Sequence, residues 1–443
     1  MAAKRDNAEP AAAALLARYA RGERAFGPLQ LAGADLKRVM LMEGQMAGAD
    51  FSGADLSGAN LVRAALMGAD FSGADLTGAT LIKANLTDAR LDGVNLSRAF
   101  MDSASLSNTT FTEANLSGAR LKGVRLYGTS LRGACLEAAD LTGAMMAGAD
   151  LTDARADGAN LGGALLTGAR LPNASLREAN LSSAELNRAD MAGANLEGAI
   201  LFRTSMERVK LAGANLRGAR LLECDLRGAD LSDADMTGVE LTGSTLSGAD
   251  LSRADLSGVE FFGANLDGAL LADCISDDKT RWPASFKKTE DKVAAPHEPP
   301  RSSSELKERY ARGELHLSGA RLPSAQLVGA DLKRADLSDG NFERANLGRA
   351  NLNSANCARV NFLRTSLIEA SLISALLTGA DLSGANLDGA NLTRADLTGA
   401  DLRGTNLTRA TLHNANLRDA LFNPTTRWPS GFDPAAAGAT QKR

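Results

Sequence analysis

Large apolar residues recur at every fifth position along most of this chain. In residues 26–271, Leu, Phe or Met fills every such position except one, which is Ala156. A second series in residues 317–422 is interrupted only at Cys357. Two places before each large residue stands a small one, usually Ala, and the other three places are mainly polar residues or Gly. The chain therefore repeats one five-residue unit.

A stride of five fits neither regular secondary structure. Five residues of an α-helix turn through about 500°, so the large residues would advance by about 140° per unit and cover every face. In a plain strand, successive large residues would fall on opposite faces. The small and large apolar residues of one unit are two apart, which is strand spacing, whereas the step to the next unit needs a corner. The pattern predicts a coil of flat sides and sharp turns, with the large residues pointing inward.

The repeated string resembles the pentapeptide-repeat family. Residues 49–61, ADFSGADLSGANL, carry the motif A(D/N)LxG, and such units cover about 360 of 443 residues. The resemblance implies an all-β solenoid, namely a right-handed quadrilateral β-helix with four units in each coil. Residues 20 apart would then stack on one face, with coils about 4.8 Å apart. At Ala156 we expect a small cavity or an inward shift of its neighbours.

The segments that flank the two series also repeat. The string YARGE occurs at 19–23 and again at 310–314, just before each series begins. Arg-Trp-Pro occurs at 281–283 and 427–429, just after each series ends. The open ends of a solenoid must be covered to prevent edge pairing, and Trp and Pro suit that role. We therefore expect a short helix across the first coil of each block and an Arg-Trp-Pro cap on its last coil.

The chain is thus predicted to be a tandem duplication in two blocks, each with a short N-terminal capping helix. Pro10 and Ser304 are residue types that favour the start of these helices. The expected segments are a capping helix (1–25), a first solenoid (26–276), a tail with a mobile linker (277–304), a second capping helix (305–316), a second solenoid (317–422) and a second tail (423–443).

Composition favours a reduced compartment. The four cysteines have no CxxC spacing, and no apolar run is as long as a membrane span. The first 23 residues join a basic head to a short apolar run, as a signal peptide does. Arg18 and Arg21 cut that run short, and a similar segment recurs in mid-chain, so we favour the helix. We expect a cytoplasmic bacterial protein.

Catalytic chemistry finds little support in the sequence. The three histidines, His297, His316 and His413, are scattered, and the glycines follow the five-residue repeat rather than a phosphate-binding motif. A filled core also leaves no natural pocket. We expect no enzymatic activity, no cofactor, no metal and no small-molecule substrate.

The outer surface is the remaining candidate for function. The residue before each large one points outward, and at a 20-residue stride the carboxylates gather in two adjoining columns of the first solenoid. Residues 26–276 contain about ten more acidic than basic groups, and residues 317–422 are close to neutral. Repeated copying of a residue that suits the solvated side would also produce such columns. The candidate surface residues are Asp35, Asp50, Asp55, Asp70 and Asp75 near one end and Asp230, Asp235, Asp250 and Asp255 near the other.

Two functions compete on this basis. The first is a non-enzymatic scaffold that binds an unidentified protein through its solenoid faces, with homodimerisation left open. The second is suggested by the resemblance, because some pentapeptide-repeat proteins protect DNA gyrase, a type II topoisomerase, by imitating acidic duplex DNA. The modest charge weakens this alternative. Direct nucleic-acid binding is not expected, since no basic stripe follows the rod. A secreted host-directed effector is a third class, disfavoured by the lack of an export signal.

Overall fold

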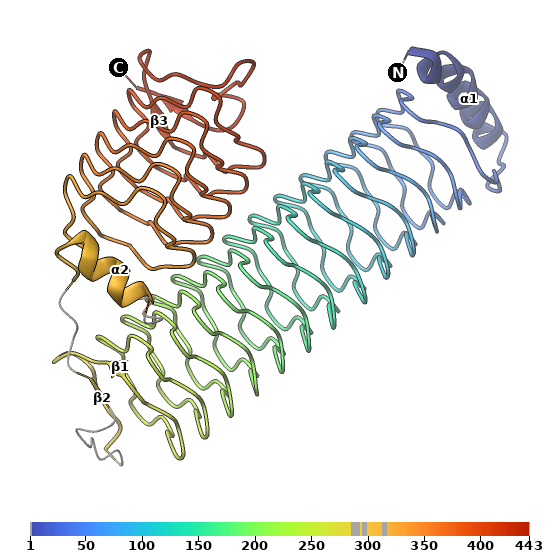
Figure 1. The fold of residues 1–443 in the computed structure, drawn as a ribbon. Helices are drawn as coiled ribbons and strands as arrows, with labels where there is room; N and C mark the ends of the chain where they lie inside the picture. Colours follow the sequence, from blue (N-terminus) through green and yellow to red (C-terminus); the bar gives the residue numbers. More distant parts are fainter. Residues whose placement is uncertain (1, 285–292, 295–298, 312–316, 443) are drawn as a thin grey trace. The chain divides into compact units, whose positions relative to one another are not determined.

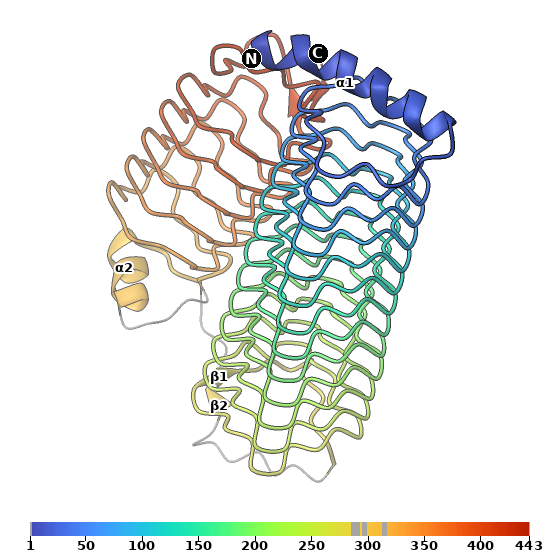
Figure 2. The same cartoon turned by 90° about the vertical axis from the view of Figure 1, so that its right-hand side faces the viewer.

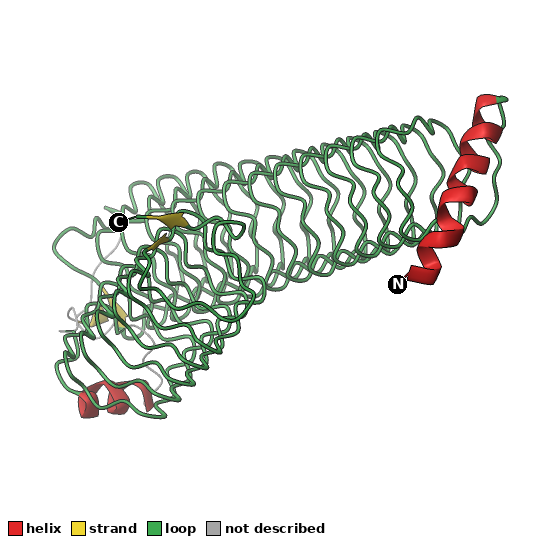
Figure 3. Ribbon diagram, turned by 90° about the horizontal axis from the view of Figure 1, so that it is seen from above, coloured by secondary structure: helices red, strands yellow, loops and turns green. Residues whose placement is uncertain are grey.

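The computed structural model describes residues 2–284, 293–294, 299–311 and 317–442. The chain divides into two compact units, Met1–Ala294 and Ala295–Arg443 (Figure 1). Each unit is a stack of four-sided coils around its own apolar core. Figure 2 shows the coils of the first unit following one another along a single axis. Figure 3 draws almost all of both stacks as loop, because the sides pair through single bridges rather than long strands.

A backbone ladder holds each coil to the next. Asp35 forms a parallel bridge with Asp55, and Asp55 forms one with Asp75, so that residues 20 apart lie side by side. The Leu56 amide N–H donates to the Asp75 carbonyl at 2.7 Å, and the Asp75 N–H donates back to Ala54 at 2.9 Å. The same pairing recurs at every fifth residue through both units. Four pentapeptides therefore form one coil, as the resemblance implied.

Each corner is a tight turn with one residue in the left-handed region. In one unit the Ala59 N–H donates to the Leu56 carbonyl at 2.9 Å, and Gly58 between them has a φ of 65°. Such a positive φ at the third residue of a turn favours Gly. Arg38 and Arg98 nevertheless take the same conformation, with φ of 53° and 57°. The ladder on both sides therefore imposes the corner even where the residue disfavours it.

The large residues fill the core. Between Leu31 and Phe261, no residue at the large apolar position is more than 2% exposed. The Phe51 and Phe71 rings, one coil apart, are stacked with centroids 4.8 Å apart and planes 9° apart. These observations confirm that a stride of five places the large side chains inside the coil. Stacking one residue type on the next gives a continuous, filled apolar column.

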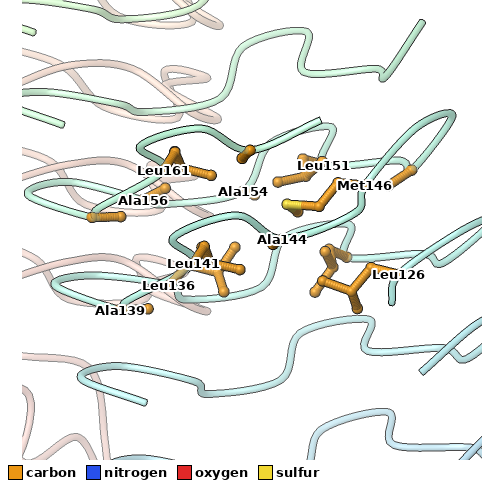
Figure 4. Packing of buried hydrophobic residues seen from close by; sticks show 14 of the residues in the cluster. Leu126, Leu136, Ala139, Leu141, Ala144, Met146, Leu151, Ala154, Ala156 and Leu161 are labelled. Atoms are coloured by element: carbon orange, nitrogen blue, oxygen red, sulfur yellow. The ribbon is translucent and has the colours of Figure 1, made fainter. Parts of the chain in front are cut away.

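The short side chain of Ala156 does not disturb the ladder. Figure 4 shows Ala156 among the longer side chains of Leu136, Leu141 and Leu161. On the side of the preceding coil, the Leu136 N–H donates to the Arg155 carbonyl at 2.6 Å. On the side of the following coil, the Ala156 N–H donates to the Ser175 carbonyl at 2.7 Å. Neighbouring hydrogen bonds between coils elsewhere have the same lengths, so the axial spacing of the coils is unchanged at the truncated position.

Two helices precede the two stacks and dock in the same way. Helix α1 spans Ala2–Ala20, and α2 spans Ser303–Ala311. In each helix a Leu four residues before a Tyr is buried in the core of its unit, Leu15 in α1 and Leu306 in α2. The Tyr19 hydroxyl donates to the Met42 carbonyl at 3.2 Å, and that of Tyr310 donates to Lys333 at 2.8 Å. Both acceptors lie 23 residues after the Tyr.

The expected helix starts were wrong. Helix α1 begins at Ala2, so Pro10 lies inside it, where a proline removes one backbone hydrogen bond. At α2 the cap is Ser302 rather than Ser304, because the Ser302 hydroxyl accepts the Glu305 N–H at 3.1 Å. Residues 312–316, the last part of the expected second helix, lie outside the described residues.

Each stack ends in matching tail contacts. In the first unit Arg281 adds a last bridge to Glu260, and the Trp282 ring stacks on Phe261 with centroids 5.1 Å apart. In the second unit Arg427 bridges Asn406, and Trp428 packs edge-on against Phe422. Both bridges span 21 residues, so one extra residue enters the last coil.

A short parallel strand pair lies at the end of each stack. Strand β1, Cys274–Ile275, pairs with β2, Val293–Ala294, and β3, Leu421–Phe422, pairs with β4, Thr440–Gln441. Strand β2 falls inside the segment expected as a linker. Residues 285–292 and 295–298 of that segment lie outside the described residues.

Candidate functional site

The ladder places the nine candidate aspartates in two neighbouring columns. Bridges join Asp35, Asp55 and Asp75 in one column and Asp50 and Asp70 in the next. The same columns later contain the bridged pairs Asp235–Asp255 and Asp230–Asp250. The two columns flank one corner of the coil, the one that carries residues such as Ser52 and Gly53. We call this corner, with its nine aspartates, the acidic edge.

The aspartates of the acidic edge also build the turns. Asp55 Oδ1 accepts the amide N–H of Ser57 at 3.1 Å and its hydroxyl at 2.7 Å. Asp75 Oδ1 accepts the Thr77 N–H at 2.9 Å. Such a bond to the backbone two residues on is a local turn motif of Asp and Asn. The other seven aspartates of the acidic edge accept the same bond from the backbone N–H two residues later. The donors are Lys37, Ser52, Ser72, Ser232, Thr237, Ser252 and Ser257.

Basic side chains neutralise part of this edge. Lys37 Nζ lies 3.2 Å from an Asp55 carboxylate oxygen and 3.8 Å from one of Asp35. Arg90 lies 3.6 Å from Asp70. The hydrogen bond to Asp55 and the nearby carboxylates raise the pKa of Lys37. Partial burial raises the pKa of Asp55, but the bonds from Ser57 and Lys37 outweigh it and leave that pKa below its usual value.

The remaining aspartates are not uniformly exposed. Asp235 is only 4% exposed and lies 3.3 Å from Arg217. Within the described residues, five members of the acidic edge form no ion pair, and all five are half-buried: Asp50, Asp75, Asp230, Asp250 and Asp255. The edge is therefore acidic, but less densely charged than its sequence implies.

Sequence reasoning missed a second surface feature, an apolar edge on the opposite corner. Two corners further along the coil from the acidic edge, apolar side chains occupy two places of the unit. One is the outward residue just before the large core residue, and the other is the residue just after it. In a four-sided coil, two corners on is diagonally opposite. The apolar edge consists of Met40, Met42, Val62, Ile82 and Phe100 near one end and Ile200, Phe202, Leu222 and Phe262 near the other. Phe262 is 76% exposed and Met40 is 53% exposed.

A signal for this edge is present in the sequence. The place after the large residue is usually Ser, Thr, Ala or a charged residue, and an apolar residue there breaks the pattern. Met42, Val62 and Ile82 break it three times at the 20-residue interval. Comparing that place across coils would have identified the edge.

Other reactive groups are isolated or buried. Burial raises the pKa of the Cys224 thiol to about 11, and burial likewise raises that of Cys357. The parts of the chain that the structure describes contain no group of three or more His, Cys, Asp or Glu that could hold a metal ion. His413 is exposed, and His297 and His316 lie outside the described residues.

No helix in the described ranges is both long enough and apolar enough to cross a membrane.

Comparisons with known proteins agree with this architecture. A family model described as pentapeptide repeats matches residues 30–98, 104–198, 204–275 and 314–423. A search of curated proteins found no significant match.

Several solved structures are similar. HetL of the cyanobacterium Nostoc sp. strain PCC 7120, a pentapeptide repeat protein involved in heterocyst differentiation regulation, is 31% identical, with 60% of this chain and 98% of HetL covered and a TM-score of 0.31. The pentapeptide repeat protein alr5209 of the same organism is 32% identical, with 33% and 100% covered and a TM-score of 0.19. QnrB1, a plasmid-mediated fluoroquinolone resistance protein, is 18% identical, with 50% and 94% covered and a TM-score of 0.30.

Proposed function

Since this chain belongs to the pentapeptide-repeat family, whose members fold as right-handed quadrilateral β-helices, we propose that it is a non-enzymatic protein-interaction scaffold. The observation that carries the proposal is the filled core. Leu, Phe and Met occupy the interior of every coil, so binding chemistry is confined to the outer columns and corners. The partner is a protein, and the compartment we propose is the bacterial cytoplasm.

We propose the same plan for both halves of the chain. A helix covers the first coil, as the Tyr19 and Tyr310 hydroxyls dock on backbone carbonyls 23 residues on. An Arg-Trp-Pro tail covers the last coil. The proposed boundaries are the six segments expected from the sequence, with the solenoids at 26–276 and 317–422.

The proposed contact surface for the partner is the acidic edge. Carboxylates stacked on successive coils in two neighbouring columns present a short negative strip near each end of the first solenoid, which favours a partner with a basic groove or helix. Charges on adjacent coils, about 4.8 Å apart, repel by about 0.9 kcal/mol per pair in water. That cost is small beside burial of a Leu, about 1.5–3 kcal/mol, so the core tolerates the strip.

The experiment replaces charge while keeping the turns. Asn also accepts the bond from the residue two places on, as Asn60 does from Val62 at 3.2 Å. A variant with Asn at Asp35, Asp50, Asp55, Asp70 and Asp75 should therefore fold normally. Affinity capture from the native cell should recover a partner with the wild type and lose it with this variant. The matched control replaces Asp331, Asp381, Asp388, Asp396 and Asp401 of the second unit.

Equal capture by wild type and by the acidic-edge variant would remove the acidic edge as the contact surface. A turnover activity abolished by one surface substitution without unfolding would remove the scaffold proposal itself.

A second candidate is a DNA mimic that binds and protects a type II topoisomerase. Its support is the pair of bridged acidic columns on the first unit. The charge is modest, because residues 26–276 contain 31 acidic and 21 basic side chains. A supercoiling assay with purified gyrase decides the matter. If micromolar protein causes neither inhibition nor drug protection, this candidate is excluded.

A further inference from the structure

An aspartate fastens the chain where it leaves the last coil of the first unit. In earlier coils, the N–H of a corner glycine donates to a main-chain carbonyl 19 residues later, as Gly238 does to Ser257 at 2.8 Å. At the end of the stack, the Gly258 N–H donates instead to the carboxylate oxygen Oδ1 of Asp277, again 19 residues later and at 2.8 Å. The side chain of Asp277 therefore takes the place of a main-chain carbonyl.

The same oxygen also gathers the start of the tail. Asp277 Oδ1 accepts the N–H of Lys279 at 3.1 Å and that of Thr280 at 3.0 Å. The Thr280 hydroxyl lies 3.0 Å from this oxygen and 2.9 Å from the Leu256 carbonyl oxygen of the coil below. One carboxylate thus ties the turn both to itself and to the preceding coil.

This turn delivers the tryptophan that covers the end of the core. Arg281 forms the last bridge of the ladder, and its carbonyl accepts the Phe261 N–H at 2.9 Å. Trp282 comes next and stacks on the Phe261 ring. We call residues 277–283 the first cap and the matching residues 423–429 of the second unit the second cap. Loosening the Asp277 turn would free the first cap and uncover the apolar end of the core.

The second cap has the same turn with a neutral side chain. Asn423 Oδ1 accepts the N–H of Gly404, 19 residues earlier, at 3.0 Å and that of Thr425 at 3.2 Å. The Thr426 N–H donates to the main-chain carbonyl of Asn423 at 3.0 Å, whereas the Thr280 N–H is 3.4 Å from the corresponding carbonyl in the first unit. The main chain therefore closes the second turn, and the first turn depends more on its carboxylate.

The charge of Asp277 strengthens the first turn. Hydrogen bonds from N–H groups to an ionised carboxylate are about twice as strong as those between neutral groups. Partial burial raises the pKa of Asp277, but the bonds from Gly258, Thr280 and Lys279 outweigh it and leave that pKa below its usual value.

No ion pair contributes to this turn. Within the described residues, Asp277 pairs with no cation, and strand β2 carries no charge. The charged residues of the neighbouring segments are Asp273, Asp278, Lys279 and Arg281 on its own stretch of chain and Asp255 and Glu260 on the coil below. The N–H donors are thus the groups that respond directly when Asp277 changes its charge.

From the difference between the two turns we propose that the first cap is an acid-sensitive fastening that opens when Asp277 is protonated, and that the second cap lacks this response. Protonation turns the carboxylate into a weaker, neutral acceptor for three N–H groups. Because the pKa of Asp277 is lowered in the folded protein, its stabilising effect is complete above the ordinary carboxyl pKa and is lost as pH falls through the lowered pKa. Asn423 keeps the same charge throughout.

Tryptophan fluorescence of the full chain tests the proposal, because the chain has two tryptophans and each cap contains one. The Trp428→Phe variant reports on the first cap, and the Trp282→Phe variant reports on the second. Acrylamide quenching is measured from neutral pH to well below the ordinary carboxyl pKa. We expect quenching of Trp282 to rise as pH falls, while quenching of Trp428 stays constant. A joint response of both tryptophans, or no response of Trp282, would overturn the proposal.

A single substitution assigns the response to Asp277. In the Trp428→Phe background, Asp277→Asn should keep the cap closed and abolish the acid response of Trp282, because an amide oxygen holds the matching turn of the second unit. The matched control is Asp267→Asn, at an exposed carboxylate of the last coil that accepts no hydrogen bond within the described residues, and it should keep the response. An acid response that survives Asp277→Asn, or one that Asp267→Asn also removes, would refute the assignment.

Discussion

Replacing Ala156 by Leu should stabilise the first unit. Ala156 occupies a core position that is Leu, Phe or Met in every other unit of its series, and its side chain is 1% exposed. The hydrogen bonds between coils keep their ordinary lengths there, so the coils have not moved together along the axis to fill the space of the missing atoms. Leu adds three carbon groups, worth about 0.8 kcal/mol each when buried. Subtracting about 0.5–1 kcal/mol for side-chain entropy leaves a gain of about 1.5 kcal/mol.

The assay is denaturant unfolding followed by hydrogen exchange. Each coil contacts mainly its neighbours, so the gain should appear as slower exchange of amides in the coils at 136–176. The matched control is Ala154→Leu, two residues earlier in the same unit. Ala154 is also 1% exposed, but it occupies the small inward place, where overpacking should cost about 1–3 kcal/mol.

The two variants together decide whether the reasoning holds. A destabilised Ala156→Leu protein would mean that neighbouring side chains already fill the space. A tolerated Ala154→Leu would mean that the two inward places do not differ in size, and the account of the repeat would fail.

Three further predictions concern the caps, the corners and pH. Trp282→Ala should remove the stack on Phe261 and cost about 3 kcal/mol, seen as faster hydrogen exchange confined to the last coils; unchanged exchange there would contradict a capping role. Ala138→Gly should stabilise the first unit by about 0.5–1 kcal/mol, because Ala138 has a φ of 53°, which Gly adopts more readily. The control Ala139→Gly, at the buried next residue, should destabilise the unit by more than that. The reverse order of melting temperatures would refute the claim that the corner imposes a strained φ. The Arg403 hydrogen bond lowers the pKa of Asp401, so its stabilising effect is present above the ordinary carboxyl pKa and is lost as pH falls through the lowered pKa. The melting temperatures of wild type and Asp401→Asn should differ at pH 7, and the difference should shrink as pH falls below the ordinary carboxyl pKa; a constant difference would contradict this.

The core was predictable because it follows a strict rule. A large residue every fifth place, with a small one two places earlier, leaves few geometries that bury both. The repeated YARGE string indicated the docking helices for the same reason, since Leu15 and Leu306 precede their tyrosines by four residues. The helix starts were not predictable, because Ser302, Ser303 and Ser304 are equivalent as residue types and only the Ser302 hydroxyl reaches Glu305.

The surface was harder to predict than the core. The sequence located the aspartates in their columns, but it could not show that Asp55 is bonded to Ser57 and Lys37, or that Asp235 is nearly buried. The contacts of Lys37 with Asp55 and of Arg217 with Asp235 both join side chains on neighbouring coils. The apolar edge was overlooked because its residues are scattered singly along the chain and gather only when coils are compared.

The left-handed corners have a consequence for how such a molecule changes over generations. Arg38 and Arg98 show that a corner keeps its shape without Gly, at a cost of about 1–2 kcal/mol per residue. A point mutation there alters what the outside presents, yet leaves the interior stacking untouched. New specificities can therefore be tried one corner at a time, without inventing a new fold for each.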